Sequence, residues 1–320
     1  MSAFVDTAAN GEWQPSALAS GVLDAGASGD KPIGVILSGI GRLDADKVEQ
    51  VLAHQRAHGG RFGEAAIALK LASTEDVVSA LAQQFSYPYA NPDRRKTSPE
   101  LVTLNDPFSR QAEAFRAIRS QLMMRVVAPL AGANGVNGTN GAAAARRAIA
   151  IISPDSGDGK SFFAANLAVV LAQLGGRTLL VDADLRGPRQ HQVFDLPNPA
   201  GLSGLLAGRA DGPVVQRVHD VPSLYVLPVG PTPPNPLELV ERPAFAQLLA
   251  ELCTRFEHVI VDTPAHRYGA DGPVIAARCG LALIVARKHS SRISALQALV
   301  GVLGGGATQL AGVILNEYPG

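Results

Sequence analysis

Short apolar runs recur along the second half of the chain and are separated by helical segments. The runs are 148–153, 178–184, 224–230, 258–264, 281–287 and 310–316. Near-continuous apolar runs of this length are typical of strands buried on both faces, and their alternation with helices is typical of a parallel sheet with crossover helices. The pattern therefore predicts an α/β fold for this part of the chain.

An internal repeat of apolar positions precedes this region. Residues 33–55 align with 62–84 at an offset of 29 residues, so that Gly34 matches Gly63. In each copy a short helical piece leads through a turn into a longer helix with one apolar face. Residues suited to cap these longer helices precede them: Asp44, and Ser73 with Asp76. The repeat predicts a small helical module.

Composition between these patterns predicts the domain boundaries. Stretches rich in Ala, Gly, Ser and Asn without apolar periodicity lack side chains large enough to build a core. We expect a flexible leader at 1–30, the helical module at 31–92, a connecting segment at 93–128, a flexible linker at 129–147 and the α/β domain at 148–320.

Charge and hydropathy narrow the classes of function. With 28 basic and 28 acidic residues among 320, the chain has no overall field to attract nucleic acid. No apolar run reaches the roughly 18 residues of a membrane span, and the N-terminus lacks the pattern of a secretory signal. We expect a soluble cytoplasmic protein in which Cys253 and Cys279 stay reduced.

The sequence "GDGKS" at 157–161 follows a predicted strand and opens a predicted helix. In this context the backbone N–H groups of a glycine-rich turn converge on phosphate, a lysine reaches the outer phosphates and a hydroxyl binds magnesium. Lys160 and Ser161 take the last two roles, although Pro154 stands where the full motif has glycine. The predicted nucleotide-binding residues of this turn are Gly157, Asp158, Gly159, Lys160 and Ser161.

Three carboxylates follow strands of the same predicted sheet. Asp182 and Asp184 end one apolar run, and Asp262 ends another. Ligands of open α/β sheets bind at the carboxyl ends of the strands, and magnesium prefers carboxylates beside phosphate oxygens. The sequence therefore predicts a site for a nucleoside triphosphate with Mg²⁺.

Residues 108–318 resemble the bacterial tyrosine kinases that work with chain-length regulators in polysaccharide export, which are relatives of the ParA/MinD ATPases. The resemblance rests on "SPDSGDGKS", "LLVDADLR", "VIVDTP" and "GPTPPNPLELV", together with the Glu-x-x-Arg-x-x-Arg pattern of "EAFRAIR". The partition ATPases have a lysine at the position of Asp155. The resemblance implies a ParA/MinD-like P-loop NTPase fold, with a mostly parallel sheet flanked by helices and preceded by the small helical repeat domain.

The resemblance also implies a role for each matching residue. Lys160 would stabilise the transferring phosphate of ATP, Asp182 would be the base for a tyrosine hydroxyl, and Asp184 would support the metal site. The remaining roles are Mg²⁺ binding by Ser161 and Asp262 beside Asp184, an adenine contact by Asn316, and subunit contacts by Glu113, Arg116 and Arg119. Proton transfer to a carboxylate near the γ-phosphate suits phosphoryl transfer, which depends mainly on positioning and charge neutralisation.

The helical module resembles the N-terminal domain of type II secretion and pilus-assembly ATPases, some of which bind cyclic di-GMP. By that resemblance Arg61 and Gly63 would contact the dinucleotide. Pro32 replaces the motif arginine in the first copy and Lys70 replaces a motif glycine in the second. A plain docking module is the alternative. Module and kinase domain together resemble the EpsG-like kinases of exosortase-linked exopolysaccharide systems.

These resemblances imply an ATP-dependent tyrosine autokinase that regulates exopolysaccharide chain length and export. A ParA/MinD-like ATPase switch and a cyclic di-GMP-responsive regulator are the alternatives. The resemblance implies a homo-oligomer that is peripheral at the inner membrane through a Wzz-like chain-length partner. Only four residues follow Asn316, too few to reach comfortably into another subunit, so we expect Tyr318 to be a packing or edge residue rather than the acceptor, with Tyr87 and Tyr89 as alternative acceptors.

Overall fold

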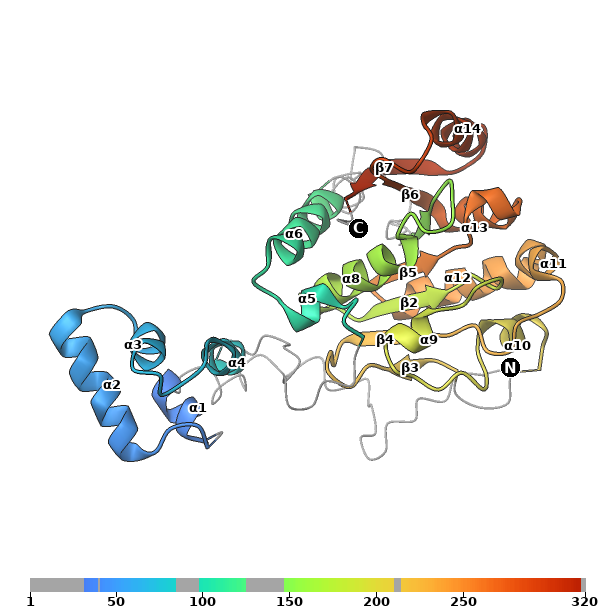
Figure 1. Cartoon of the computed structure of the whole chain (residues 1–320). Coiled ribbons are helices and arrows are strands. Elements are labelled where there is room, and N and C mark those ends of the chain that lie inside the picture. Colours follow the sequence, from blue (N-terminus) through green and yellow to red (C-terminus); the bar gives the residue numbers. More distant parts are fainter. Residues whose placement is uncertain (1–31, 40, 85–97, 125–146, 210–213, 318–320) are drawn as a thin grey trace, which may run out of the picture. The chain divides into compact units, whose positions relative to one another are not determined.

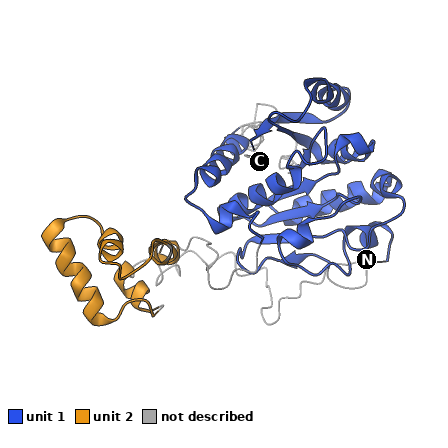
Figure 2. Cartoon of the chain, in the orientation of Figure 1, with its two compact units in different colours: residues 1–7, 96–320 blue, residues 8–95 orange. Residues whose placement is uncertain are grey.

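A computed structural model describes residues 32–39, 41–84, 98–124, 147–209 and 214–317 (Figure 1). The chain divides into two compact units, one comprising 8–95 and the other 96–320 with 1–7 (Figure 2). Several predictions fall outside the described residues, namely the leader 1–30, the linker 129–147 except for Arg147, and the tyrosines Tyr87, Tyr89 and Tyr318. None of the described helices is long and apolar enough to cross a membrane.

The first unit contains the repeat as two pairs of helices. Its helices are α1 (Ile33–Gly39), α2 (Ala45–His58), α3 (Phe62–Ala68) and α4 (Thr74–Gln84). The predicted caps are confirmed: Asp44 accepts from Lys47 N at 2.9 Å, and Ser73 and Asp76 bond each other's backbone N–H. Leu37, Val51, Ala66 and Ala80 form a fully buried centre.

The repeated glycines of this unit lie where helices approach closely. A Cβ on Gly63 would lie 2.5 Å from Cγ1 of Val77, and a Cβ on Gly34 would lie 3.0 Å from Cζ of Phe62. Glycine at these matched positions therefore permits the packing of α3 on α4 and of α1 on α3. Packing alone explains why the repeat contains Gly34 and Gly63.

The second unit is built on a seven-stranded sheet of order β3-β4-β2-β5-β1-β6-β7. Its strands are β1 (Ala148–Ile152), β2 (Thr178–Asp182), β3 (Gln216–Arg217), β4 (Leu224–Leu227), β5 (His258–Asp262), β6 (Gly280–Arg287) and β7 (Gln309–Asn316). Every neighbouring pair is parallel except β3 with β4. The predicted mostly parallel α/β sheet is therefore confirmed.

Helices cover both faces of the sheet (Figure 1). They are α5 (Val102–Asn105), α6 (Arg110–Leu122), α8 (Lys160–Ala172), α9 (Gln190–Val193), α10 (Leu202–Leu206), α11 (Pro236–Glu241), α12 (Pro243–Arg255), α13 (Asp271–Cys279) and α14 (Ile293–Gly304), with the 3₁₀ helix η4 (His266–Tyr268). The side chains of α12 and α13 share one core with alternate residues of β1, β2 and β5.

Helix α8 is buried on all sides because its sequence is apolar all round. It packs on β1, β2 and β5, and its outer surface is covered by α5 and α6. The segment predicted to connect the two domains thus contributes α5 and α6 to the same unit as the sheet. Helices α5 and α6 therefore contact the helix that begins at Lys160.

Substitution of Gly63 by alanine should destabilise the helical unit by about 1–3 kcal/mol, because the added methyl group would overlap Val77. Hydrogen exchange of peptides from 33–84 in the full chain measures the effect. Gly39→Ala is the matched control, since nothing lies within 4 Å of its Cβ position. Equal protection of the two variants would contradict the packing role of Gly63.

Candidate active site

The predicted phosphate loop lies between β1 and α8, at the carboxyl edge of the sheet. Gly157 and Gly159 have φ angles of 86° and 93°, a left-handed conformation that suits glycine. Lys160 directly follows as the first residue of α8. The loop therefore leads straight into a helix N-terminus, where free N–H groups and the helix dipole favour an anion.

Asp158 and Asn316 hold this loop in place. Asp158 is 1% exposed, and its carboxylate accepts hydrogen bonds from Asp155 N at 2.8 Å and Ser291 Oγ at 2.7 Å. Asn316 Nδ2 donates to the Asp158 carbonyl at 3.0 Å and lies 2.2 Å from where a Cβ on Gly159 would be. Asn316, predicted as an adenine contact, thus braces the loop itself.

Lys160 and Asp184 form a nearly buried ion pair. The distance from Nζ to Oδ2 is 3.4 Å, and the side chains are 10% and 8% exposed. The other carboxylate oxygen accepts from the backbone N–H groups of Arg186 at 3.3 Å and Gly187 at 2.9 Å. An anion that entered the loop would compete with Asp184 for the ammonium group of Lys160.

Asp182 and Asp262 lie opposite each other on the neighbouring strands β2 and β5, and both are fully buried. Burial, followed by the charge of Asp262, raises the pKa of Asp182 well above its usual range. Burial also raises the pKa of Asp262, against the opposing effects of Lys160, Ser161 and Gln190. The structure therefore places two carboxylates that disfavour each other's ionisation beneath the phosphate loop.

Gln190 joins this acidic pair and was not found by the sequence analysis. Its buried side-chain Nε2 donates to the Ser161 carbonyl at 3.1 Å and to Asp262 Oδ2 at 2.8 Å, while its backbone N–H donates to Asp182 Oδ2 at 2.9 Å. Among the described residues, Asp262 Oδ1 and Gln190 Oε1 have no hydrogen-bond partner. Only the fold could identify this residue, because its partners come from three separate segments.

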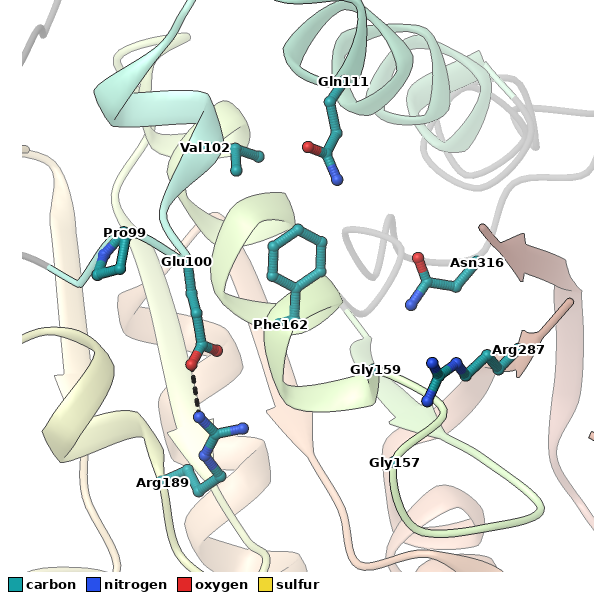
Figure 3. A pocket seen from close by; sticks show the side chains of 10 residues that line it. All are labelled: Pro99, Glu100, Val102, Gln111, Gly157, Gly159, Phe162, Arg189, Arg287 and Asn316. Carbon is teal, nitrogen blue, oxygen red and sulfur yellow. Dashed lines mark hydrogen bonds and ion pairs between the residues drawn. The ribbon is translucent and has the colours of Figure 1, made fainter. Parts of the chain in front are cut away.

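Two adjoining cavities open at the loop and share Gly157, Gly159, Phe162 and Arg189. The first, of about 550 Å³, is also lined by Lys160, Ser161 and Asp184. The second, of about 480 Å³, is also lined by Asn316, Arg287 and Glu100, and its Glu100–Arg189 ion pair measures 2.6 Å (Figure 3). Asp182 and Asp262 line neither cavity.

The described side chains suit a divalent cation that brings phosphate and water ligands with it. Ser161, Asp184 and the unpartnered Oδ1 of Asp262 offer oxygen atoms of the kind that Mg²⁺ prefers. Within the described ranges, no three His, Cys, Asp or Glu side chains lie close enough to hold a metal ion by themselves. A cation here therefore requires phosphate oxygens to complete its coordination.

The arginine of the acidic motif, Arg186, anchors another helix. Its Nε donates to Asp271 Oδ2 at 3.0 Å and its Nη2 donates to Oδ1 at 3.3 Å. Asp271 is the first residue of α13 and is 2% exposed. This two-point contact fixes the segment after β2 against α13.

The residues predicted for subunit contacts have partners within the chain. Arg116 bonds Glu113 and the Pro107 carbonyl, and Arg119 Nη1 donates to the Val170 carbonyl of α8 at 2.8 Å. The subunit role of Glu113, Arg116 and Arg119 stays a prediction.

The predicted cyclic di-GMP residues lie in the helical unit. Arg61 N donates to Glu64 Oε2 at 2.9 Å at the start of α3. Gly63 is in close contact with Val77. Their role in binding a dinucleotide also stays a prediction.

Comparison with known proteins gives a consistent family. Residues 149–320 match the family model described as the CobQ/CobB/MinD/ParA nucleotide binding domain. The chain is 33% identical to the putative tyrosine-protein kinase CapB of Staphylococcus aureus over 229 residues, which are 71% of this chain and 92% of CapB. It is 31% identical to the tyrosine-protein kinase YwqD of Bacillus subtilis, over 68% of this chain and 85% of YwqD.

Two solved structures are also similar to this chain. The chimerical protein CapA2B2 aligns with a TM-score of 0.60 at 31% identity, over 76% of this chain and 99% of the chimera. The kinase domain of the Escherichia coli tyrosine kinase ETK aligns with a TM-score of 0.61 at 29% identity, over 71% of this chain and 84% of that domain. Other relatives are longer: the match spans only 23% of the tyrosine-protein kinase ptk of Acinetobacter johnsonii.

Replacing Asp262 with asparagine should stabilise the fold at neutral pH by on the order of 1 kcal/mol, because it removes a buried charge opposite Asp182. Folding raises the pKa of Asp262 above its unfolded value of 3.8. Keeping this carboxylate ionised therefore lowers the stability of the folded state at pH values above about 4. The advantage should therefore disappear as the pH falls to about 4.

Urea denaturation at neutral and acid pH measures this difference, with exposed Asp106→Asn as the control. If Asp262→Asn instead lowered the free energy of unfolding at neutral pH, the ionised carboxylate of Asp262 would be net stabilising, which would contradict this prediction.

Proposed function

Because this chain belongs to the bacterial tyrosine-protein kinases, within the wider CobQ/CobB/MinD/ParA nucleotide-binding family, we propose that it transfers the γ-phosphate of ATP to tyrosine hydroxyl groups, including its own. One observation carries the proposal. Lys160, Ser161 and Asp184 line a single cavity at the N-terminus of α8. A cation, a hydroxyl and a carboxylate at a helix N-terminus are the groups that phosphoryl transfer needs.

Lys160 binds the transferring phosphate in this proposal. The backbone N–H groups of the 157–161 turn hold the remaining phosphates, as is usual for such turns. When phosphate draws the Lys160 ammonium group away, Oδ2 of Asp184 loses its partner and becomes free to accept a proton. Binding of the nucleotide and activation of the carboxylate are thereby coupled.

Ser161 and Asp262 would hold Mg²⁺, which neutralises charge on the phosphates when bound, and Asp184 would support this metal site as a neighbouring charge rather than as a ligand. Gln190 orients Asp262 by occupying Oδ2, so that Oδ1 is the oxygen available to the site. The side chain of Gln190 also bonds the Ser161 carbonyl, and so holds two of these three residues at a fixed separation.

The geometry favours different tasks for Asp182 and Asp184. Oδ1 of Asp182 accepts from Asp184 N and its Oδ2 accepts from the backbone of Arg189 and Gln190, and the side chain lines neither cavity. We therefore assign acceptance of the tyrosine proton to Asp184, which lines the first cavity. Asp182 holds the segment that carries Asp184 and Gln190.

The wider context of the kinase is also a proposal. The resemblance of the "GPTPPNPLELV" segment to the kinases of polysaccharide export supports a role in exopolysaccharide chain length and export, with a Wzz-like membrane protein as activator and a homo-oligomeric kinase at the inner membrane. The helical unit would be the docking domain, similar to that of secretion ATPases, and the whole chain would be EpsG-like. Among the described residues, no contact favours cyclic di-GMP binding over helix packing as the explanation for a glycine at position 63.

Lys160→Met should abolish both ADP formation and phosphate incorporation, since no other described lysine lines the two cavities at the loop. Intact-mass spectrometry after incubation with ATP and Mg²⁺ measures incorporation. Lys47→Met, at a partly exposed lysine of α2, is the control and should behave as the unmodified chain. Incorporation at the original rate by Lys160→Met would refute the site.

Arg116→Ala should shift the protein to smaller species in sedimentation velocity if the Glu-x-x-Arg-x-x-Arg helix joins subunits. Arg110→Ala, an exposed change on the same helix, is the control. Arg119 is left unchanged because its bond to Val170 stabilises α8 within the chain. Identical sedimentation of both variants would indicate that α6 serves only the fold of its own chain.

A further inference from the structure

A tyrosine side chain lies in the same cavity as the proposed phosphotransfer groups. The chain has five tyrosines, of which Tyr225 and Tyr268 fall within the described residues. Tyr268 lines the cavity of about 550 Å³ together with Lys160 and Asp184, and it is 50% exposed. Tyr225 lies on β4, where its ring packs against Phe256 with centroids 5.4 Å apart, and it lines neither cavity at the loop.

The backbone holds Tyr268 beside the phosphate loop. Its 3₁₀ helix η4 follows β5 closely, and His266 N donates to the Ser153 carbonyl at 2.9 Å. Arg267 N donates to the Pro154 carbonyl at 3.1 Å. These bonds join the turn that carries Tyr268 to the first residues of the loop that ends at Lys160. The position of the tyrosine relative to the loop is therefore set by hydrogen bonds rather than by a flexible tail.

Side-chain contacts leave the hydroxyl of Tyr268 available. The Arg267 guanidinium lies over the ring, 5.8 Å from its centroid, and it also lies 3.6 Å from Asp155 of the loop. No hydrogen bond to the hydroxyl is present within the described part of the chain. The ring is thus held at one face while the nucleophilic atom is free.

We propose that Tyr268 is an intramolecular phosphoacceptor, modified by the active site of its own chain. The proposal rests on the kinase function proposed above. In the step, Oη of Tyr268 attacks the γ-phosphorus of ATP, and the bond from that phosphorus to the β–γ bridging oxygen breaks, so that ADP leaves with the electron pair. The hydroxyl proton passes to the carboxylate of Asp184, which lines the same cavity, and then to solvent.

Transfer within one chain has a kinetic signature. Because Tyr268 and Lys160 belong to the same cavity of the same unit, no encounter between molecules is needed. The rate of phosphorylation at Tyr268 should be first order and independent of protein concentration. Phosphorylation between separate molecules should slow in proportion to dilution. Transfer between subunits of an oligomer would instead label Tyr268 of a Lys160→Met chain that is mixed with the active chain.

The test is a time course of the full chain with ATP and Mg²⁺ at several protein concentrations, analysed by site-resolved phosphopeptide mass spectrometry. We expect phosphate on the Tyr268 peptide at a rate that dilution does not change. Tyr268→Phe should lose this concentration-independent phase, and the matched control Tyr225→Phe should keep it. Lys160→Met should show no phosphate on any tyrosine.

The outcomes separate this inference from the proposed function. A reaction that labels other tyrosines or an added tyrosine copolymer while Tyr268 stays unmodified would overturn the inference and leave the kinase function intact. A rate at Tyr268 that falls in proportion to dilution would likewise overturn transfer within the chain. Absence of phosphotyrosine on the chain and on the copolymer together would overturn the kinase function as well.

Discussion

Two buried carboxylates on adjacent strands are the constraint on which the site depends. The register of β2 and β5 places Asp182 opposite Asp262, and both are removed from water. Isolated buried charges cost several kcal/mol, so the fold must supply compensating donors. It does so with the backbone of Arg189 and Gln190, the amide of Gln190 and the charge of Lys160. Of these residues, Lys160 and Arg189 also line the cavity of about 550 Å³ at the phosphate loop.

Helix α8 also connects the site to the outer helices α5 and α6. Asn166 is fully buried and accepts from both the N–H and the hydroxyl of Thr103, while it donates to the carbonyls of Glu100 and Phe162. Phe162 lines both cavities, and its ring lies 5.9 Å from that of Phe115 on α6. A displacement of α6 would therefore be transmitted to Phe162, beside the phosphate loop, through its contact with Phe115.

Sequence reasoning could predict the sheet, the loop and its acids because each leaves a local pattern. Asp182 and Asp262 end apolar runs, and Lys160 belongs to a motif of fixed spacing. Contacts between segments that are distant in the sequence leave no such pattern. The bonds of Gln190 depend on the approach of three segments, and the close approach of Asn316 to Gly159 depends on how β7 is placed. The proximity of Tyr268 to the loop, for which no motif exists, appears only in the fold.

The central claim is that this site delivers phosphate to tyrosine rather than to water. ATP labelled on the γ-phosphate, with Mg²⁺ and an added tyrosine copolymer, tests it by the division of label between phosphotyrosine and inorganic phosphate. We expect phosphotyrosine on the chain or the copolymer, formed in step with ADP. Label found only as inorganic phosphate would contradict the account and identify the protein as an ATPase switch.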